Sequence, residues 1–183
     1  MTDWKPPGTY DASAYKSMEA SGDGVAAFGP RAAKLSEDMR TFVEDVKELE
    51  ILAPETGKPI LASDHKRRFF EAAWLHKYNG KYYFSYSTGD THLLAYAIGD
   101  TPSGPFTYTG TILEPVVGWT THHSIAEFKG KWYLFYHDSS LSGGRNHLRC
   151  VKCREIVYDG QGHIKLAEPQ GNIQEAQGKI EKA

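Results

Sequence analysis

One carboxyl group stands out as a candidate acid–base catalyst. Glu71 follows Phe70 directly and lies three residues before Trp74. Aromatic neighbours exclude water, and partial desolvation favours the protonated form of a carboxyl group, which is the form that a general acid requires. The simpler interpretation is an exposed glutamate that pairs with Arg67 or Arg68, and the residues alone favour that interpretation.

A pair of adjacent histidines, His122 and His123, is the second candidate. Adjacent residues of a strand point to opposite faces, so one imidazole can face a site while the other points into the packing of the sheet. The imidazole that faces the site could hydrogen-bond a sugar hydroxyl or reach a cation, directly or through water. A histidine whose hydrogen bonds are satisfied within the core is the simpler alternative.

Aromatic and basic residues supply further candidates for binding. Aromatic residues make up 13% of the chain, including 11 Tyr and 4 Trp. Such a composition suits β-sheets, and it also suits carbohydrate sites, where rings stack on sugar faces. Trp74 and Trp119 could line a sugar subsite or belong to the core, and Arg149 could fix a hydroxyl or a carboxylate.

The two cysteines, Cys150 and Cys153, form a CxxC motif that elsewhere marks redox or zinc sites. Here they lie in a segment that is predicted to be a strand. Residues three apart on a strand point to opposite faces, which opposes both a disulfide and shared metal ligation. No second CxxC motif completes a zinc site, so we interpret both as structural thiols.

An internal repeat predicts the fold. Residues 71–86 align with residues 121–136 at a constant offset of 50 residues. The identical positions are Gly80 with Gly130, Lys81 with Lys131, Tyr83 with Tyr133, and Tyr86 with Tyr136. Periods of about 40–50 residues built from short strands are typical of propeller blades.

Each repeat contains four predicted strands. The first unit has strands at 70–78, 79–87, 93–98 and 106–113, and the second has them at 123–128, 131–138, 147–157 and 162–166. Asn79-Gly80 is a strong hairpin signal between the first two strands. The sequence therefore predicts an all-β chain, residues 1–183, that forms one partial propeller domain of about two and a half blades.

The blade boundaries follow from the same pattern. We predict one blade over 66–116, one over 117–168 and a partial blade over 30–60. Strands at 30–42 and 46–51 would form the partial blade, and a helix over 37–49 is the competing interpretation. Residues 1–29 read as an irregular segment and 169–183 as a C-terminal tail.

Length and charge exclude several classes of protein. The 183 residues suffice for one domain with a core, and the net charge of −2 gives no general attraction to nucleic acid or anionic membranes. No apolar run reaches about 18 residues, so no transmembrane helix is expected. The polar start, Met1–Tyr10, is unlike a signal peptide, which predicts a cytoplasmic protein if that start is native.

Several segments together resemble one enzyme family. Phe70–Ser87 resembles the blade of family 43 glycoside hydrolases that begins with a glutamate and an aromatic-rich hairpin. Thr101–Tyr108 resembles the hairpin connection of that family, and Gly118–Asp138 is similar to its next blade. Ala33–Met39 resembles a strand-turn element after the second blade, and the likeness extends over about residues 25–166.

The resemblance implies a five-bladed propeller that acts on arabinose- or xylose-containing oligosaccharides with inversion. Such enzymes use an Asp base, a Glu acid and a third Asp that tunes the acid. Glu71 matches the acid, and His122 best matches an axial histidine near a calcium ion or water cluster, with His123 as the alternative. The predicted contacts to substrate are Trp74, Trp119, His123 and Arg149.

The chain departs from the family pattern at several points. The Asp base belongs to a first blade that this chain lacks, and Asp11 is a remote candidate for the tuning Asp. Ala72 or Ala73 replaces the usual proline near the acid. Inversion needs a second carboxylate about 6.5–9.5 Å from the acid, so hydrolysis without that group should be very slow.

An incomplete ring requires a partner. Propellers close with about four to eight blades, so we expect a homo-oligomer or a partner chain that completes the ring. The alternative to a glycosidase is a non-catalytic carbohydrate-binding fragment, or an inert one that oligomerises to cover its open sheet edges.

Overall fold

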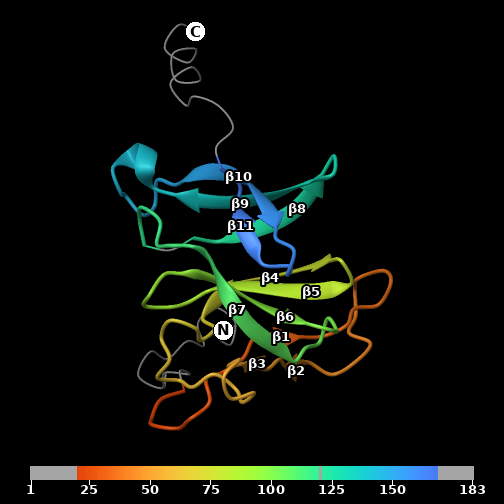
Figure 1. Ribbon diagram of the computed structural model, residues 1–183. Helices are drawn as coiled ribbons and strands as arrows, with labels where there is room; N and C mark the ends of the chain where they lie inside the picture. The colour runs from red at the N-terminus through yellow and green to blue at the C-terminus, as the bar shows by residue number, and fades with distance from the viewer. Residues whose placement is uncertain (1–19, 120, 169–183) are drawn as a thin grey trace, which may run out of the picture.

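The computed structural model describes residues 20–119 and 121–168, and within them the chain is built from β-strands (Figure 1). Two larger sheets lie stacked, and a small two-stranded sheet lies beside the lower one. The strands are β1 (Arg31–Ala32), β2 (Lys47–Glu48), β3 (Ile51–Leu52), β4 (Glu71–Tyr78), β5 (Lys81–Ser87), β6 (Leu94–Gly99), β7 (Phe106–Leu113), β8 (His123–Phe128), β9 (Lys131–Asp138), β10 (Cys150–Tyr158) and β11 (Ile164–Leu166).

The strand order is that of two consecutive propeller blades. The lower sheet has the order β3-β7-β6-β5-β4 and the upper sheet the order β11-β10-β9-β8. From β4 to β7 and from β8 to β11, each strand pairs antiparallel with the next one along the chain. The all-β propeller class that the repeat predicts is confirmed, and the eight predicted strands of the two units are all present.

Two tight hairpins open the two blades. Asn79 and Gly80 have φ values of 45° and 80°, and Lys129 and Gly130 have φ values of 52° and 76°. Positive φ at both central residues is the signature of the two-residue hairpin turns whose twist matches that of paired strands. The register follows, because Tyr78 pairs with Lys81 in the first hairpin just as 128 pairs with 131 in the second.

The core lies in two layers, one on each face of the lower sheet. Alternate residues of β5 point to opposite faces, so Phe84 and Tyr86 join one layer while Tyr83 joins the other. In the first layer these side chains pack with Leu49, Ala53 and Ile60, which flank or follow β3. The second layer fills the space between the two large sheets with Tyr83, Leu94, Tyr96, Ile112, Leu113, Ile125, Leu134, Ile156 and Ile164.

The region of the expected partial blade differs from its prediction. The alternative helix over 37–49 is wrong, because this region contains loops and β2. Ser36 accounts for the difference: its hydroxyl donates to Asp38, its carbonyl accepts from the N–H of Met39, and its N–H donates to Thr41. These local bonds form a turn that competes with a helix.

A second difference concerns the edge of the lower sheet. The segment expected as a strand over 46–51 forms two short strands, and β3 pairs in parallel with β7 rather than within a sheet of its own. The lower sheet therefore has five strands instead of the four that were predicted. None of the helices in the described ranges is long and apolar enough to span a membrane.

Candidate active site

The first strands of the two blades bring the candidate residues together. β4 and β8 occupy the matching edges of their sheets and lie against each other. Glu71 begins β4, and His122 directly precedes β8. The Nε2 atom of His122 lies 3.6 Å from Oε1 of Glu71, and their side chains are 57% and 35% exposed. The carboxyl and the imidazole are thus neighbours, and both are partly exposed to solvent.

A β-bulge sets the direction of Glu71. Glu71 pairs with Ser87 and Trp74 pairs with Ser85, so β4 has one more residue than β5 across this interval. Residues three apart in a regular strand point to opposite faces, but the extra residue returns Glu71 to the face that Trp74 occupies. That face is turned toward the upper sheet, where His122 lies.

The bulge holds Ala72 at φ 59°, a left-handed conformation that costs an L-residue about 1–2 kcal/mol. We expect Ala72→Gly to raise the free energy of unfolding by up to about 1 kcal/mol, because glycine adopts this φ without strain. Urea denaturation measures the change. Ala73→Gly is the matched control, since Ala73 lies outside the left-handed region and should lose about 0.5–1 kcal/mol. Equal decreases in the free energy of unfolding of the two variants would contradict backbone strain at Ala72.

The two adjacent histidines point in opposite directions. His122 is exposed beside Glu71, whereas the Nε2 of His123 lies 2.6 Å from the Ser85 hydroxyl, between the sheets. Burial, with smaller effects from the nearby His122 and His76, lowers the pKa of His123 to about 3. The structure therefore brings His122, and not His123, to the candidate acid.

The two tryptophans also differ in their surroundings: Trp74 lies between strands and Trp119 is exposed to solvent. The indole N–H of Trp74 donates to the carbonyl of Ile125 at 3.1 Å, so this side chain joins β4 to β8. The side chain of Trp119 is 64% exposed, and its ring packs edge-on against His92 with centroids 4.8 Å apart. An exposed, laterally supported ring is suited to stacking on a sugar, and Trp119 keeps its predicted role as a candidate.

Arg149 is exposed and lies just before β10, and its Nε–H donates to the carbonyl of Asn146 at 2.7 Å. Its Nη1 lies 3.3 Å from Nε2 of His137, which also accepts the backbone N–H of His122 at 3.0 Å. Burial, Arg149 and His122 lower the pKa of His137 below its ordinary value. His137 therefore links Arg149 to the segment that carries His122.

The sequence analysis placed residue 137 only within the predicted strand over 131–138, and so missed this contact. The internal repeat could have indicated that His137 lies near the candidate site. The offset of 50 residues places His137 on Ser87, which is the residue that pairs with Glu71. The Ser87 hydroxyl donates to the carbonyl of Thr121, and the Thr121 hydroxyl donates to the carbonyl of His137. The equivalent positions Ser87 and His137 are thus both hydrogen-bonded to Thr121.

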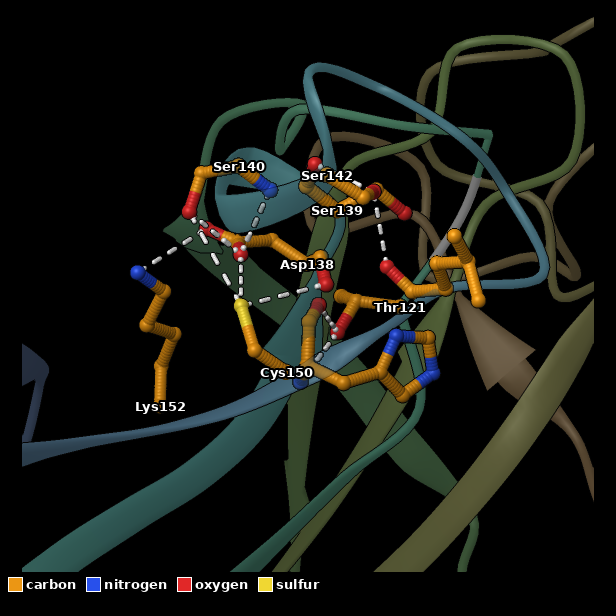
Figure 2. Close-up of polar contacts among 9 residues, drawn as sticks. Thr121, Asp138, Ser139, Ser140, Ser142, Cys150 and Lys152 are labelled. Carbon is orange, nitrogen blue, oxygen red and sulfur yellow. Dashed lines mark hydrogen bonds and ion pairs between the residues drawn. The ribbon is translucent and has the colours of Figure 1, made fainter.

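Figure 2 shows how the end of β9 anchors the loop that precedes Arg149. Asp138 accepts hydrogen bonds from the Ser140 hydroxyl at 2.9 Å and from the Cys150 thiol at 2.9 Å, and Lys152 lies 3.7 Å from the same carboxylate. Partial burial opposes ionisation, but the bonds from Cys150 and Ser140 outweigh it and hold the pKa of Asp138 below its usual value. This network fixes both ends of the loop.

The cysteines follow the prediction. Cys150 and Cys153 are both free thiols, and their positions in β10 place them on opposite faces of the sheet. Cys150 has a structural partner in Asp138, whereas Cys153 is exposed.

The described residues do not form a metal site by themselves. Within 20–119 and 121–168, no group of three or more His, Cys, Asp or Glu side chains converges to hold an ion. His122 and Glu71 offer one imidazole and one carboxylate, which is fewer ligands than a calcium ion requires. Asp11, the remote candidate for the tuning carboxylate, lies outside the described residues.

Comparison with known proteins gives consistent matches, although no family model matches the chain. The chain is 65% identical over 161 residues to a xylosidase/arabinosidase 43A of Humicola insolens, covering 88% of this chain and 49% of that protein. It is 62% identical over 138 residues to a β-xylosidase of Xylanibacter ruminicola, covering 75% and 43%. The chain thus spans about half the length of the curated relatives it matches.

Solved structures agree in fold. One is a family 43 β-xylosidase/α-arabinofuranosidase from a compost metagenome, in complex with xylotriose and in a calcium-free form. It matches with a TM-score of 0.81 and 57% identity, over 91% of this chain and 50% of that one. A GH43_1 enzyme of Xanthomonas citri matches with a TM-score of 0.79 and 51% identity, over 90% and 50%. From these identities and this shared architecture, the chain is a partial member of glycoside hydrolase family 43.

Proposed function

We propose that this chain supplies the general acid, Glu71, of a glycosidase that removes terminal xylosyl or arabinofuranosyl groups from oligosaccharides by inversion. The observation that carries the proposal is the position of Glu71. A bulge turns its carboxyl toward the partly exposed His122, in a chain 65% identical to a xylosidase/arabinosidase. Solved relatives bind xylose and xylotriose, which supports a pentose-containing substrate.

The proposed chemistry needs two carboxyl groups. Glu71 protonates the oxygen of the departing group while a second carboxylate takes a proton from water, and that water attacks the anomeric carbon from the opposite face. Inversion requires the two groups to be about 6.5–9.5 Å apart. We assign the second carboxylate to the half of the relatives that this chain does not match.

An exposed apolar surface supports the proposal that another polypeptide packs against this chain. The upper sheet covers the lower sheet with one face, and its other face exposes a row of apolar side chains. These are Phe128, Phe135, Val151 and Val157, which are between 40% and 79% exposed. In a propeller such a face packs against the next blade. We therefore propose that the missing half, or a second copy of this chain, covers it.

Calcium takes no step in the proposed chemistry. A calcium-free form of one relative suggests that some members bind the ion, and His122 is the residue of this chain that would approach it. The described residues supply too few ligands for a complete site, so any such site would draw on water or on the missing half.

Fragment complementation tests the proposal. We would combine this chain with a polypeptide that carries the unmatched half of the Humicola insolens relative, and follow the release of nitrophenol from nitrophenyl xyloside and arabinofuranoside. We expect background turnover from each half alone and clear turnover from the mixture, because each half holds one of the two carboxyl groups.

The alternative, a non-catalytic carbohydrate-binding fragment, is favoured by the chain spanning only half of its relatives. A mixture that forms a stable complex but never turns over either substrate would favour this alternative. Turnover by the chain alone would contradict the assignment of the base to the missing half. Mass measurement in solution shows whether a second copy, rather than the missing half, covers the open face.

A further inference from the structure

One imidazole nitrogen connects three separate segments around the candidate site. Nε2 of His137, near the end of β9, accepts the backbone N–H of His122 at 3.0 Å and lies 3.3 Å from Nη1 of Arg149. His122 leads into β8 beside Glu71, and Arg149 leads into β10. The segments before β8 and β10 thus meet at this one atom.

The donors fix the proton position of the imidazole. A backbone N–H and an arginine N–H can only donate, so the nitrogen that they share must carry a lone pair. In the neutral ring the proton then lies on Nδ1, which is buried and has no hydrogen-bond partner within the described residues. The ring is held by its acceptor nitrogen and by its backbone, which exchanges two hydrogen bonds with the buried Thr121.

We propose that His137 is a positioning residue, which presents the Arg149 guanidinium to a sugar hydroxyl and holds the His122 backbone beside Glu71 through one unprotonated Nε2. The sugar contact rests on the proposed function, whereas the positioning of Arg149 does not. Among the described residues, Arg149 has one further side-chain hydrogen bond, to the carbonyl of Asn146, and its side chain is exposed. Two anchors restrict a long side chain far more than one.

Two substitutions separate positioning from simple packing. His137→Gln keeps an oxygen acceptor at about the reach of Nε2, whereas His137→Leu keeps bulk and removes the acceptor. If the role is positioning, His137→Gln retains the orientation of Arg149 and His122, and His137→Leu loses it. If His137 only fills space beside His122, the two variants behave alike.

Nuclear magnetic resonance of the chain provides the readout. In the unmodified protein, long-range ¹H–¹⁵N correlation at neutral pH should show Nε2 of His137 unprotonated and Nδ1 protonated. The Nη–H signals of Arg149, assigned from their loss in Arg149→Lys, should exchange with water about tenfold faster in His137→Leu and nearly as in the wild type in His137→Gln, since the hydrogen bond from Nη1 to residue 137 is lost only in the first.

Xylotriose binding by the chain combined with the unmatched half, followed in the same way, extends the test to function. We expect affinity about tenfold weaker in His137→Leu and retained in His137→Gln. A proton on Nε2, or Arg149 exchange that is unchanged in His137→Leu, would overturn the inference whatever the sugar does. If the spectra behave as expected but the wild type combined with the unmatched half does not bind xylotriose, the positioning stands and the proposed function fails.

Discussion

Replacing Glu71 with glutamine should lower turnover of xylobiose by the complemented protein about 10²–10⁴-fold, the usual contribution of a general acid. Glutamine has nearly the same shape but no proton to give to the departing sugar. Binding of xylotriose should change far less than turnover, because the contact to His122 needs only an acceptor oxygen. Initial rates and Michaelis constants of the two proteins, measured at one pH, provide the comparison.

Glu127→Gln is the matched control for this substitution. Glu127 is an exposed glutamate on β8, on the strand that His122 precedes, but near its opposite end. The control should retain the wild-type rate. A Glu71→Gln protein that turns over xylobiose as fast as the control would refute the assignment of the acid.

Mild acid should destabilise the contact between the two sheets through His76. Its Nε2 lies 2.7 Å from the Tyr158 hydroxyl, its ring stacks on Tyr83 with centroids 5.1 Å apart, and burial lowers its pKa from 6.5 to about 4. Between these two values the unfolded chain binds a proton that the folded chain does not. The contribution of neutral His76 to the free energy of unfolding is therefore fully present above about pH 6.5, and it is lost as the pH falls toward 4.

The expected loss from His76 is about 2 kcal/mol between pH 7.5 and pH 5, a window above the titration of most carboxylates. Urea denaturation across this window measures it. His76→Gln keeps a hydrogen-bonding group without a titrating ring, so its free energy of unfolding should depend less on pH. His147→Gln, at an exposed site, should follow the wild type. Identical pH dependence in all three proteins would contradict the account of His76.

The repeat predicted most of the fold because blade structure is local. Alternating residues, Asn79-Gly80 and a period of 50 residues specify hairpins, and successive hairpins pack side by side. The region before the first complete blade was harder to predict. β3 is only two residues long and is stabilised by pairing with β7, more than fifty positions later in the chain. No local sequence pattern therefore predicts it.

The candidate site was predictable in its residues but not in its geometry. The sequence singled out Glu71 and the two histidines, but a regular strand would have placed Glu71 and Trp74 on opposite faces. The bulge at Ala72 reverses that relation, and alanine gives no sign of a left-handed φ. His137 was missed because its role depends on two segments that meet only in the folded protein.

The dependence on the leaving group tests the central claim most directly. The complemented Glu71→Ala protein would be assayed with xylobiose, whose departing alcohol needs a proton, and with dinitrophenyl xyloside, whose departing phenolate does not. If Glu71 is the general acid, we predict a loss of about 10²–10⁴-fold with xylobiose and a far smaller loss with the dinitrophenyl substrate. Equal losses with both substrates would mean that Glu71 does not protonate the departing group.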